Sequence, residues 1–385
     1  MSIILSSFLC LVALFITYWI HSRVAIEMVI SPLPMPPNTP APLISIIVPA
    51  RNEERNIRRC VEALLAQSYP NFELIVIDDR STDATPQILA DLAACDARLR
   101  VLLGREKPPE WAGKPHALVQ GVEVARGAWF CFVDADTFAH LHLVSSAYLA
   151  AGEVQADLFT LLTDQELGTF WEKTILPLVF TGLAFGFPAE KVNDPSQPEA
   201  IANGQFFIIR RAIYEAVGGH TAVSDRIDED KAFAEVVKGA GYPIFIADGR
   251  EVARTRMYTS LPEMWEGWTK NIFLGLRDRL GLLAFGAFAA LMGAMALPGG
   301  LLAGLLWFSV GGEEAAAILV LEILLVWIYL LWWRVRAARA FQISGWYALT
   351  LPLGAAIFAA MMFASAYKVL FGGGVTWKGR QYQGR

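Results

Sequence analysis

A buried strand that ends in two acidic residues is the feature that most constrains this chain. Residues 128–137 read AWFCFVDADT, in which an apolar run at 129–133 is followed by Asp134 and Asp136. Such runs fill sheets that are covered on both faces, and side chains at i and i+2 of an extended chain point to the same side. This pattern predicts a site where the two carboxylates hold Mg²⁺ or Mn²⁺ together with substrate phosphates. An Asp-rich turn that ends a strand is the plainer alternative.

Short apolar runs alternate with helical stretches between residues 43 and 270. Strands are expected at residues 43–49, 72–77, 100–103, 129–133, 157–162 and 206–209. Helical patterns separate them, including one at 139–151 and one at 231–238. Strands joined by crossover helices form a mainly parallel sheet. We therefore expect an α/β domain over residues 43–270 with a mainly parallel central sheet.

Polar residues follow three of the expected strands. Ligands of open parallel sheets bind at the carboxyl ends of the strands. The residues at these ends are Arg51, Asn52, Glu53, Asp78, Asp79, Asp134 and Asp136. The convergence of three strands on one rim supports a binding site more strongly than the two aspartates alone.

Apolar residues are concentrated at the two ends of the chain. The sequence is 55% hydrophobic, which is high for a soluble protein of 385 residues. Residues 3–20 carry no charge and are long enough to span a bilayer. We expect residues 1–27 to be a transmembrane anchor rather than a cleaved signal peptide, because a basic leader and a small-residue cleavage site are missing. Residues 28–42 are rich in proline and are expected to form a semi-rigid linker.

The region 271–371 is expected to contain further membrane helices. Its apolar segments lie at 281–310, 315–333 and 344–371. The first is interrupted by Pro298, which predicts either one kinked helix or a helix with a re-entrant piece. Arg334, Arg336 and Arg339 follow the second segment and should be cytoplasmic. Three crossings would put the tail at 372–385 on the far side of the membrane. This tail is basic and should stay in the cytoplasm, so we expect one apolar stretch to be re-entrant or interfacial.

A further charge-free stretch, residues 174–189, lies inside the expected α/β domain. It is short and contains Pro177 and Pro188, so a membrane crossing is disfavoured. We expect it to lie against the bilayer and to line the entry of a molecule that comes from the membrane, with a place in the core as the alternative. The sequence thus predicts an integral protein of the cell membrane with a cytoplasmic catalytic domain.

Charge and cysteine content exclude other classes of protein. The net charge of −5 argues against a nucleic-acid partner. The four cysteines, at positions 10, 60, 95 and 131, lack metal-ligand spacing and are expected to be reduced and buried.

Four motifs in order resemble those of glycosyltransferase family 2: IIVPARNEE, VIDDRSTDAT, WAGKPHAL and FVDAD. The resemblance covers residues 43–270 and implies a GT-A nucleotide-sugar fold. It implies that the base and ribose of the donor are held by five residues, Pro49, Arg51, Asn52, Glu53 and Asp79. A carboxylate can accept the imide N–H of uracil or bond ribose hydroxyls. For Glu54, Asp78 and Asp83 a helix cap or a solvated turn is an equally good interpretation.

The same resemblance extends to the diphosphate and to the acceptor. Lys114 and Asp134 are expected to hold the nucleotide sugar, with Asp134 and Asp136 as metal ligands. Lys114 would meet the diphosphate as a point charge at a helix N-terminus, with a solvated lysine as the alternative. His116 is expected to be a local cap or a surface residue. Near the sugar and acceptor the resemblance places Asn203, Gly204 and Gln205.

The resemblance assigns the general base to Asp230, next to Glu229 in the catalytic pair. An acidic helix N-terminus is the alternative. A base is needed because an acceptor hydroxyl is a poor nucleophile at neutral pH. A single displacement would invert the anomeric carbon, and no second nucleophile is evident for a retaining mechanism.

The sequence departs from the processive members of the family, which carry a Gln-x-x-Arg-Trp motif. Trp268 and Lys270 stand at the corresponding place and are expected near the acceptor, although membrane-interface anchors are an equal alternative. The tail motif with Trp377 and Arg380 resembles membrane glycosyltransferases of carotenoid and hopanoid pathways, and is also assigned to the acceptor.

These observations predict a metal-dependent, inverting transfer of one sugar from a nucleotide-diphospho-sugar, expected to be a UDP-sugar, to a membrane lipid. The acceptor would be a hydroxyl or carboxyl of a carotenoid, hopanoid or sphingolipid-like molecule. A polyprenyl-phosphate glycosyltransferase or a polysaccharide synthase is the alternative among enzymes. A noncatalytic membrane scaffold that binds nucleotide sugars is the alternative from another class.

Overall fold

The computed structural model describes residues 28–276, 280–310, 312–371, 375–377 and 380–382, together with Val12 and Phe15. The expected anchor at 3–20 therefore lies, except for those two residues, outside the described part. The chain separates into two compact units. The sheet unit contains Ile26–Glu166 and Phe187–Met257, and the helical unit includes Leu167–Gly186 and Tyr258–Arg385.

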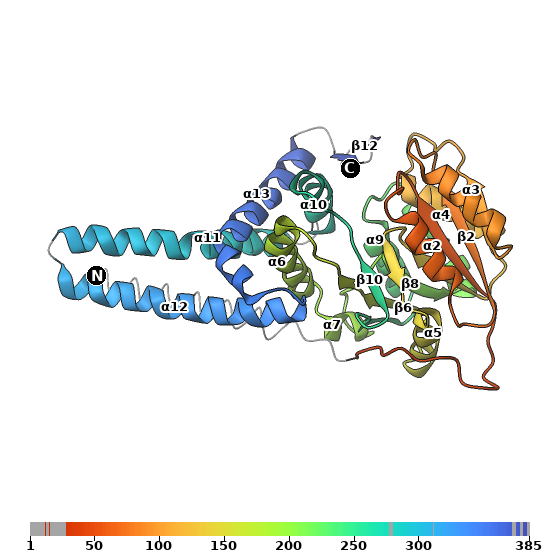
Figure 1. The fold of residues 1–385 in the computed structure, drawn as a ribbon, viewed down its shortest axis with the longest axis horizontal. Coiled ribbons are helices and arrows are strands. Elements are labelled where there is room, and N and C mark those ends of the chain that lie inside the picture. Colours follow the sequence, from red (N-terminus) through yellow and green to blue (C-terminus); the bar gives the residue numbers. More distant parts are fainter. Residues whose placement is uncertain are drawn as a thin grey trace. The chain divides into compact units, whose positions relative to one another are not determined.

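A seven-stranded sheet in the order β3-β2-β1-β4-β8-β6-β9 forms the centre of the sheet unit (Figure 1). Its strands are β1 (Ile44–Ala50), β2 (Phe72–Asp78), β3 (Leu99–Leu103), β4 (Trp129–Val133), β6 (Leu158–Leu162), β8 (Phe206–Arg210) and β9 (Ile244–Asp248). All of them run in one direction except β8, which is antiparallel to both of its neighbours. The expected α/β class with a mainly parallel sheet is confirmed.

The reversed direction of β8 determines what lies at the rim of the sheet. Val133, the last residue of β4, pairs with Phe206, the first residue of β8. The segment before β8 is therefore placed beside the segment after β4. This juxtaposition brings the loop at 203–205 next to Asp134, whose N–H donates to the carbonyl of Gln205 (3.4 Å).

Helices cover the sheet and bury their apolar faces against it. They are α2 (Ile57–Leu65), α3 (Thr85–Cys95), α4 (Gly113–Val124), α5 (Leu143–Glu153), α7 (Ala189–Asn193), α8 (Arg211–Ala216), the 3₁₀ helix η1 (Gly219–Val223) and α9 (Glu229–Gly239). In α2 the buried residues Ile57, Cys60, Val61 and Leu64 follow the spacing of one helical face.

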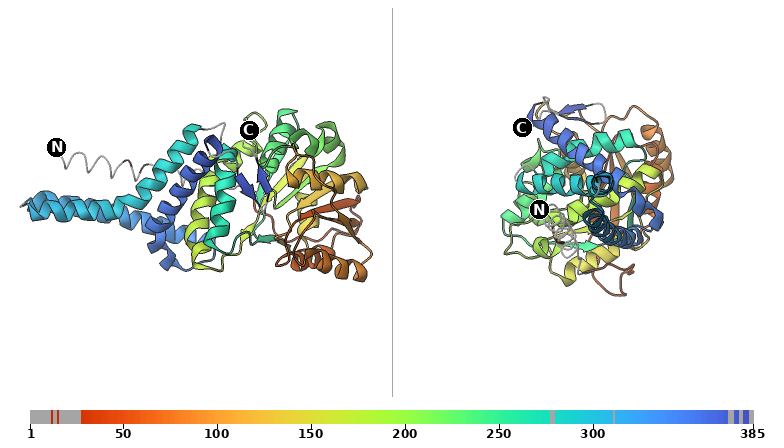
Figure 2. Two further views of the ribbon diagram at one scale, coloured as in Figure 1. Left: turned by 90° about the horizontal axis from the view of Figure 1, so that it is seen from above. Right: turned by 90° about the vertical axis from the view of Figure 1, so that its left-hand side faces the viewer.

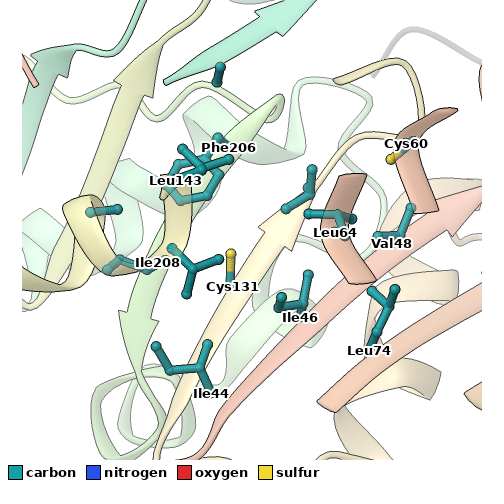
Figure 3. Packing of buried hydrophobic residues seen from close by; sticks show 14 of the residues in the cluster. Ile44, Ile46, Val48, Cys60, Leu64, Leu74, Cys131, Leu143, Phe206 and Ile208 are labelled. Carbon is teal, nitrogen blue, oxygen red and sulfur yellow. The ribbon is translucent and has the colours of Figure 1, made fainter. Parts of the chain in front are cut away.

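One hydrophobic core joins these helices to the strands. Figure 3 shows Ile46, Cys131 and Ile208 of three neighbouring strands packed together with Leu64 of α2. Cys60 is buried in the same core, as expected, but Cys95 at the end of α3 is exposed, so its expected burial is wrong. Cys10 lies outside the described residues.

A second, three-stranded sheet was not expected from the sequence. It pairs β5 (Thr137–Ala139) with β10 (Ala253–Thr255) and β10 with β7 (Asp164–Gln165). Because residues 137–139 form a strand, the helix expected at 139–151 begins later, as α5.

The proline-rich segment at 28–42 is bonded to the sheet unit rather than forming a free spacer. The N–H of Ile30 donates to the carbonyl of Asp248 at the edge of β9 (2.7 Å). Leu33 accepts a bond from the hydroxyl of Ser145 (2.7 Å) and donates its N–H to Ser146 (2.8 Å). The segment is therefore attached at both β9 and α5.

The helical unit consists of long apolar helices. They are α6 (Phe170–Gly186), α10 (Leu261–Leu276), α11 (Leu280–Ser309), α12 (Glu313–Ala340), η3 (Gly345–Thr350) and α13 (Leu351–Leu370), followed by the hairpin β11 (Val375–Trp377) and β12 (Arg380–Tyr382). Helices α11 and α12 run side by side (Figure 2). Pro298 does not interrupt α11, so of the two expected forms the structure shows a single helix.

Most of the charge-free stretch at 174–189 belongs to α6, which contacts α13 inside the helical unit. Among the described residues, one helical stretch, Gly345–Lys368, is both long and apolar enough to cross a membrane. The expected membrane crossings at the two ends of the chain stay predictions.

Candidate active site

The loops after β1 and β2 are bonded to each other. A guanidinium nitrogen of Arg51, Nη1, donates to the carbonyls of Asp79 (2.7 Å) and Arg80 (3.3 Å). Asn52 has a positive φ of 53°, which asparagine tolerates better than most residues, and its side-chain oxygen accepts the N–H of Thr82 (2.8 Å). The N–H of Glu53 donates to the hydroxyl of Thr85 (2.8 Å). These contacts fix the backbone that carries the buried Asp79 at the rim.

Three other acidic residues of these loops bond local backbone amides. Asp78 accepts the N–H of Ser81 (3.0 Å) through Oδ1. Asp83 accepts the N–H groups of Glu54 and Thr85, and the Glu54 carboxylate accepts the N–H of Ala84. The interpretation of these residues as caps and turn formers agrees with the structure. Pro49 lies in β1, paired with Ile77.

Lys114 is the centre of the cluster at the rim. It lies in the first turn of α4, and its Nζ is 2.7 Å from Oδ1 of Asp134 and 2.7 Å from Oε1 of Glu229. Three separate elements, α4, the end of β4 and the start of α9, therefore meet at one ammonium group. The alternative of a solvated lysine does not hold, because Lys114 is bonded on two sides.

Asp230 lies beside this cluster and is held by backbone donors. Its Oδ1 accepts the N–H of Lys231 (2.7 Å), and its Oδ2 accepts the N–H of Gly204 (2.9 Å). A Cβ atom added at Gly204 would lie 2.8 Å from Nζ of Lys114 and 2.9 Å from Oδ2 of Asp230. Glycine at this position allows the β8 loop to approach both charged groups.

The charged groups of the cluster are buried to different degrees: the side chain of Lys114 is 31% exposed, that of Asp134 27% and that of Glu229 7%. Burial lowers the pKa of Lys114, but the carboxylates of Asp134, Glu229 and Asp230 raise it, and the net pKa lies well above its usual value. Burial raises the pKa of Glu229 to about 7 against the lowering effect of Lys114. Burial also raises the pKa of Asp230. A carboxyl group with a pKa of about 7, such as that of Glu229, can exchange protons near neutral pH, as a general base requires.

The side chains of Asn203 and Gln205, the two neighbours of Gly204, hold the loop in place by hydrogen bonds. Asn203 donates its amide to the carbonyl of Leu161 (2.8 Å) and accepts the N–H of Gln205 (3.2 Å). The buried Gln205 bonds the hydroxyl of Thr163 through its side-chain oxygen. Asn203 and Gln205 thus position Gly204 and the carbonyl next to Asp134.

Asp136 lies in the turn between β4 and β5, where the N–H of Thr137 donates to the carbonyl of Asp134 (3.0 Å), so the extended chain expected here is wrong. The carbonyl of Asp136 accepts the N–H of Arg256 (3.3 Å), which ties it to the end of β10. Among the described residues, no three His, Cys, Asp or Glu side chains are grouped closely enough to hold a metal ion by themselves. Mg²⁺ is usually bound by one or two carboxylates, and substrate phosphates complete its coordination shell. In this structure Asp134 is paired with the ammonium of Lys114, and a divalent ion held by Asp134 and Asp136 stays a prediction.

Four residues expected near the acceptor lie in the helical unit. Trp268 and Lys270 belong to α10, where both are buried. Trp377 and Arg380 pair with each other in the β11–β12 hairpin. Their assignment to the acceptor stays a prediction.

Two buried histidines differ from the expectation or were missed. His116 is buried in α4 with its Nδ1 3.2 Å from the amide of Gln120, so it is not a surface residue. His220, which the sequence did not single out, bonds the Tyr214 hydroxyl (2.9 Å) and stacks on Phe233 behind the cluster. Burial lowers its pKa to about 3, with Lys114 adding to the effect, so it is neutral at pH 7. Because a lone histidine in a mixed segment has no distinctive pattern, the sequence carried no signal for it.

Comparison with solved structures defines the class of fold. The mannosyltransferase PcManGT of Pyrobaculum calidifontis, solved in complex with GDP-Man and Mn²⁺, is similar over 96% of this chain and 98% of its own, with a TM-score of 0.53 and 19% sequence identity. With the mainly parallel sheet, this likeness identifies a GT-A-like α/β fold.

Comparison of sequences identifies a family of domains within the chain. Residues 45–218 match the profile of Glycosyl transferase family 2. The chain contains a domain of this family and is a glycosyltransferase. It is also similar to 4,4'-diaponeurosporenoate glycosyltransferases of Staphylococcus aureus. The protein of strain USA300 is 28% identical over 88% of both chains, and that of strain MRSA252 is 28% identical over 65% of this chain and 68% of its own.

Proposed function

We propose that this glycosyltransferase moves one sugar from a nucleoside-diphosphate sugar, a UDP-sugar, to a hydroxyl or carboxyl group of a membrane lipid with inversion of the anomeric carbon. The observation that carries the proposal is the ammonium of Lys114, 2.7 Å from both Asp134 and Glu229. This contact supports the proposal, because an ammonium group can bind a diphosphate and the neighbouring carboxylates can bind a metal ion or accept a proton.

In this proposal the loops after β1 and β2 bind the nucleoside. The buried Asp79 accepts hydrogen bonds from the base or ribose. Arg51 acts indirectly, because its guanidinium holds the carbonyls of Asp79 and Arg80. Asn52 and Glu53 join the two loops through their contacts with Thr82 and Thr85.

Asp134 and Asp136 would hold a Mg²⁺ or Mn²⁺ ion, which neutralises charge on the leaving diphosphate when it is bound. Lys114 contributes a second positive charge at the same place. Its position at the first turn of α4 adds the free N–H groups and the dipole of the helix N-terminus.

Asp230 would take the proton of the acceptor. Its two oxygens accept backbone N–H groups, which fixes the orientation of the carboxylate, and burial raises its pKa toward the range of a general base. Glu229 forms an ion pair with Lys114. Its pKa depends on the charge of Asp230, so the two carboxyl groups titrate together.

The lipid nature of the acceptor rests on two kinds of support. The carotenoid-type relatives are named as 4,4'-diaponeurosporenoate glycosyltransferases. In addition, the chain carries the apolar helices α11, α12 and α13 after the sheet unit. A membrane enzyme with these helices meets its acceptor in the bilayer.

The test is to incubate membranes that contain the protein with labelled UDP-glucose and other nucleotide sugars, and to identify labelled lipids by mass spectrometry. We expect one labelled lipid class that depends on Mg²⁺ or Mn²⁺. Wholly water-soluble products would contradict the lipid acceptor. Binding of UDP and Mn²⁺ without turnover in any membrane extract would support a noncatalytic scaffold instead.

Two variants separate a hydroxyl acceptor, which must lose a proton, from a carboxylate or polyprenyl phosphate, which is already ionised at neutral pH. Asp136→Asn should abolish transfer in either case, whereas Asp230→Asn should abolish it only if the acceptor must lose a proton to a base. Asp91→Asn, an exposed site on α3, is the matched control and should retain activity. Activity retained in Asp230→Asn and lost in Asp136→Asn would favour a carboxylate or a polyprenyl phosphate, and the mass of the labelled lipid then distinguishes these two acceptors.

A further inference from the structure

Arg334 is the largest fully buried side chain among the described residues, although it was expected to flank a membrane segment in the cytoplasm. It lies in α12 of the helical unit and is 1% exposed. Arginine is almost never fully buried unless its charge is compensated. Its surroundings therefore require an explanation.

Part of the explanation lies in Pro177 of the neighbouring helix α6. Proline has no N–H, so the carbonyl of Lys173, four residues earlier, loses its helical hydrogen bond. One nitrogen of Arg334, Nη2, donates to this carbonyl (3.4 Å) and to that of Thr174 (3.0 Å). These contacts satisfy the Nη2 donor of the guanidinium.

The rest of the cluster has donors that nothing in the described part of the chain satisfies. Nε and Nη1 of Arg334 are buried without a hydrogen-bond partner there, and so is the hydroxyl of Thr174. Across the same described residues, Arg334 forms no ion pair with a carboxylate. A buried charge without a counter-charge is strongly unfavourable.

The chemistry of the missing partner follows from these donors. A guanidinium presents its N–H groups as a planar fork that matches the oxygens of a carboxylate or phosphate, and the Thr174 hydroxyl can add a further bond. Helix α13 closes on this place, because a Cβ at Gly354 would lie 2.5 Å from the carbonyl of Thr174. Since the packed helices are apolar, an acid joined to a hydrocarbon fits better than a free ion.

We propose that the junction of α6 and α12 binds the acidic group of an amphipathic lipid through Arg334 and Thr174. The site lies wholly within the helical unit and does not depend on the sugar transfer proposed above. A carboxylate lipid and a phosphate lipid share this chemistry, and the experiment distinguishes them.

The experiment measures thermal unfolding of the full chain in a neutral detergent with added oleate, dioleoyl phosphatidic acid, dioleoyl phosphatidylcholine or inorganic phosphate. We expect at least one of the two acidic amphiphiles to raise Tm in a saturable manner, because a ligand that binds only the folded protein stabilises it. The one that acts identifies the group as carboxylate or phosphate. Phosphatidylcholine and inorganic phosphate should have no comparable effect.

Two variants and a control connect the effect to the site. Arg334→Met should abolish the Tm shift, whereas Arg339→Met, at an exposed position of the same helix, should retain it. Thr174→Val keeps the charge and should weaken binding by about 3-fold to 10-fold, the loss of one hydrogen bond. It tests the proposal even if Arg334→Met does not fold.

The proposal is overturned if neither acidic amphiphile raises Tm, or if phosphatidylcholine or inorganic phosphate raises it as much. A full shift in Arg334→Met, or unchanged affinity in Thr174→Val, would also overturn it.

Discussion

At position 204 one added methyl group would touch both the cation and the proposed base of the active site. The contacts at 2.8 Å to Lys114 and 2.9 Å to Asp230 are shorter than real Cβ contacts allow. The sheet fixes the position of this backbone, because Phe206, two residues after Gly204, pairs with Val133 of β4. The charged side chains would therefore have to move.

We predict that Gly204→Ala lowers kcat/KM for the nucleotide sugar by about 100-fold, the effect of moving a catalytic group by about 1 Å. Steady-state rates with a labelled donor measure this loss. Gly152→Ala, in a helix where an added Cβ meets no atom within 4 Å, is the control and should keep full activity. A Gly204→Ala enzyme as active as the unmodified protein would show that the cluster tolerates displacement.

Glu229 should make stability depend on pH. Burial raises its pKa from 4.5 to about 7, so the folded protein holds a proton that the unfolded chain has released in this range. The stabilisation from this proton is complete below about pH 4.5 and is lost as the pH rises to about 7. The slope from one such proton is at most about 1.4 kcal/mol per pH unit.

We predict that Glu229→Gln removes this part of the pH dependence. Urea unfolding in detergent at several values between pH 5 and pH 8 should show a flatter loss of the free energy of unfolding in the variant. Glu153→Gln, at an exposed position of α5, should behave like the unmodified protein. Parallel curves for Glu229→Gln and the unmodified protein would contradict the assignment.

The sequence predicted single residues well where the signal is local. Asp134 directly follows the buried strand β4, as expected, because the end of that strand is a property of a few neighbouring residues. The meeting of Lys114 with Glu229 depends on how α4 and α9 approach the rim, and no local pattern contains it. Arg334 shows the same limit, because the carbonyl of Lys173 that it contacts is freed by Pro177 on another helix.

Helix α4 packs closely on the sheet. A Cβ at Gly121 would lie 2.6 Å from Cγ2 of Ile47 in β1 and 2.7 Å from Cδ1 of Ile77 in β2. The helix that carries Lys114 at its first turn is thus seated directly on two strands. Its distance from the sheet sets the position of the ammonium group.

We predict that Gly121→Ala destabilises the protein by about 1–3 kcal/mol, the usual cost of overpacking a core, and reduces affinity for the donor because α4 must shift. Chemical denaturation and the KM for the nucleotide sugar measure the two effects. The control is Gly239→Ala at the end of α9, where an added Cβ meets nothing within 4 Å. If Gly121→Ala matched this control in both measurements, the close packing of α4 would have no role in the site.

The elements that were predicted correctly are those with a complete local pattern. Strand β4 was predicted with its observed bounds because five buried apolar residues end abruptly at an aspartate. Strands β5 and β7 have three and two residues, too few for a period, and both exist because β10 pairs with them from far along the chain. That distant pairing is also why the start expected for α5 was wrong.

At the scale of the whole molecule, the chain divides its polar and apolar segments between two units. The rim residues from Arg51 to Asp230 all belong to the sheet unit, whereas α6 and the helices from α10 onward belong to the helical unit. The composition predicted the separation of the C-terminal helices. It could not predict that α6 joins them, because a short apolar stretch fits a core equally well.

We predict that the full chain stays in the membrane pellet after washing with high salt and then with alkaline carbonate, and is released only by detergent. Bilayer-spanning helices resist both washes, because neither removes the hydrophobic contact with lipid. Immunoblots of pellet and supernatant measure this, with a peripheral membrane protein as the control. Release of the chain by carbonate would contradict an integral membrane protein.

The place of α6 in the sequence also bears on the order in which the protein can fold during synthesis. The chain leaves the sheet unit after Glu166 and returns at Phe187. Strand β8, which alone joins β4 to β6, is made only after α6. During synthesis β1 to β4 therefore leave the ribosome before β8. The edge of β4 stays unpaired until β8 has been made. Completion of the catalytic unit has to wait for a helix that belongs to the other unit, so conditions that delay the placement of α6 would leave that edge free to aggregate.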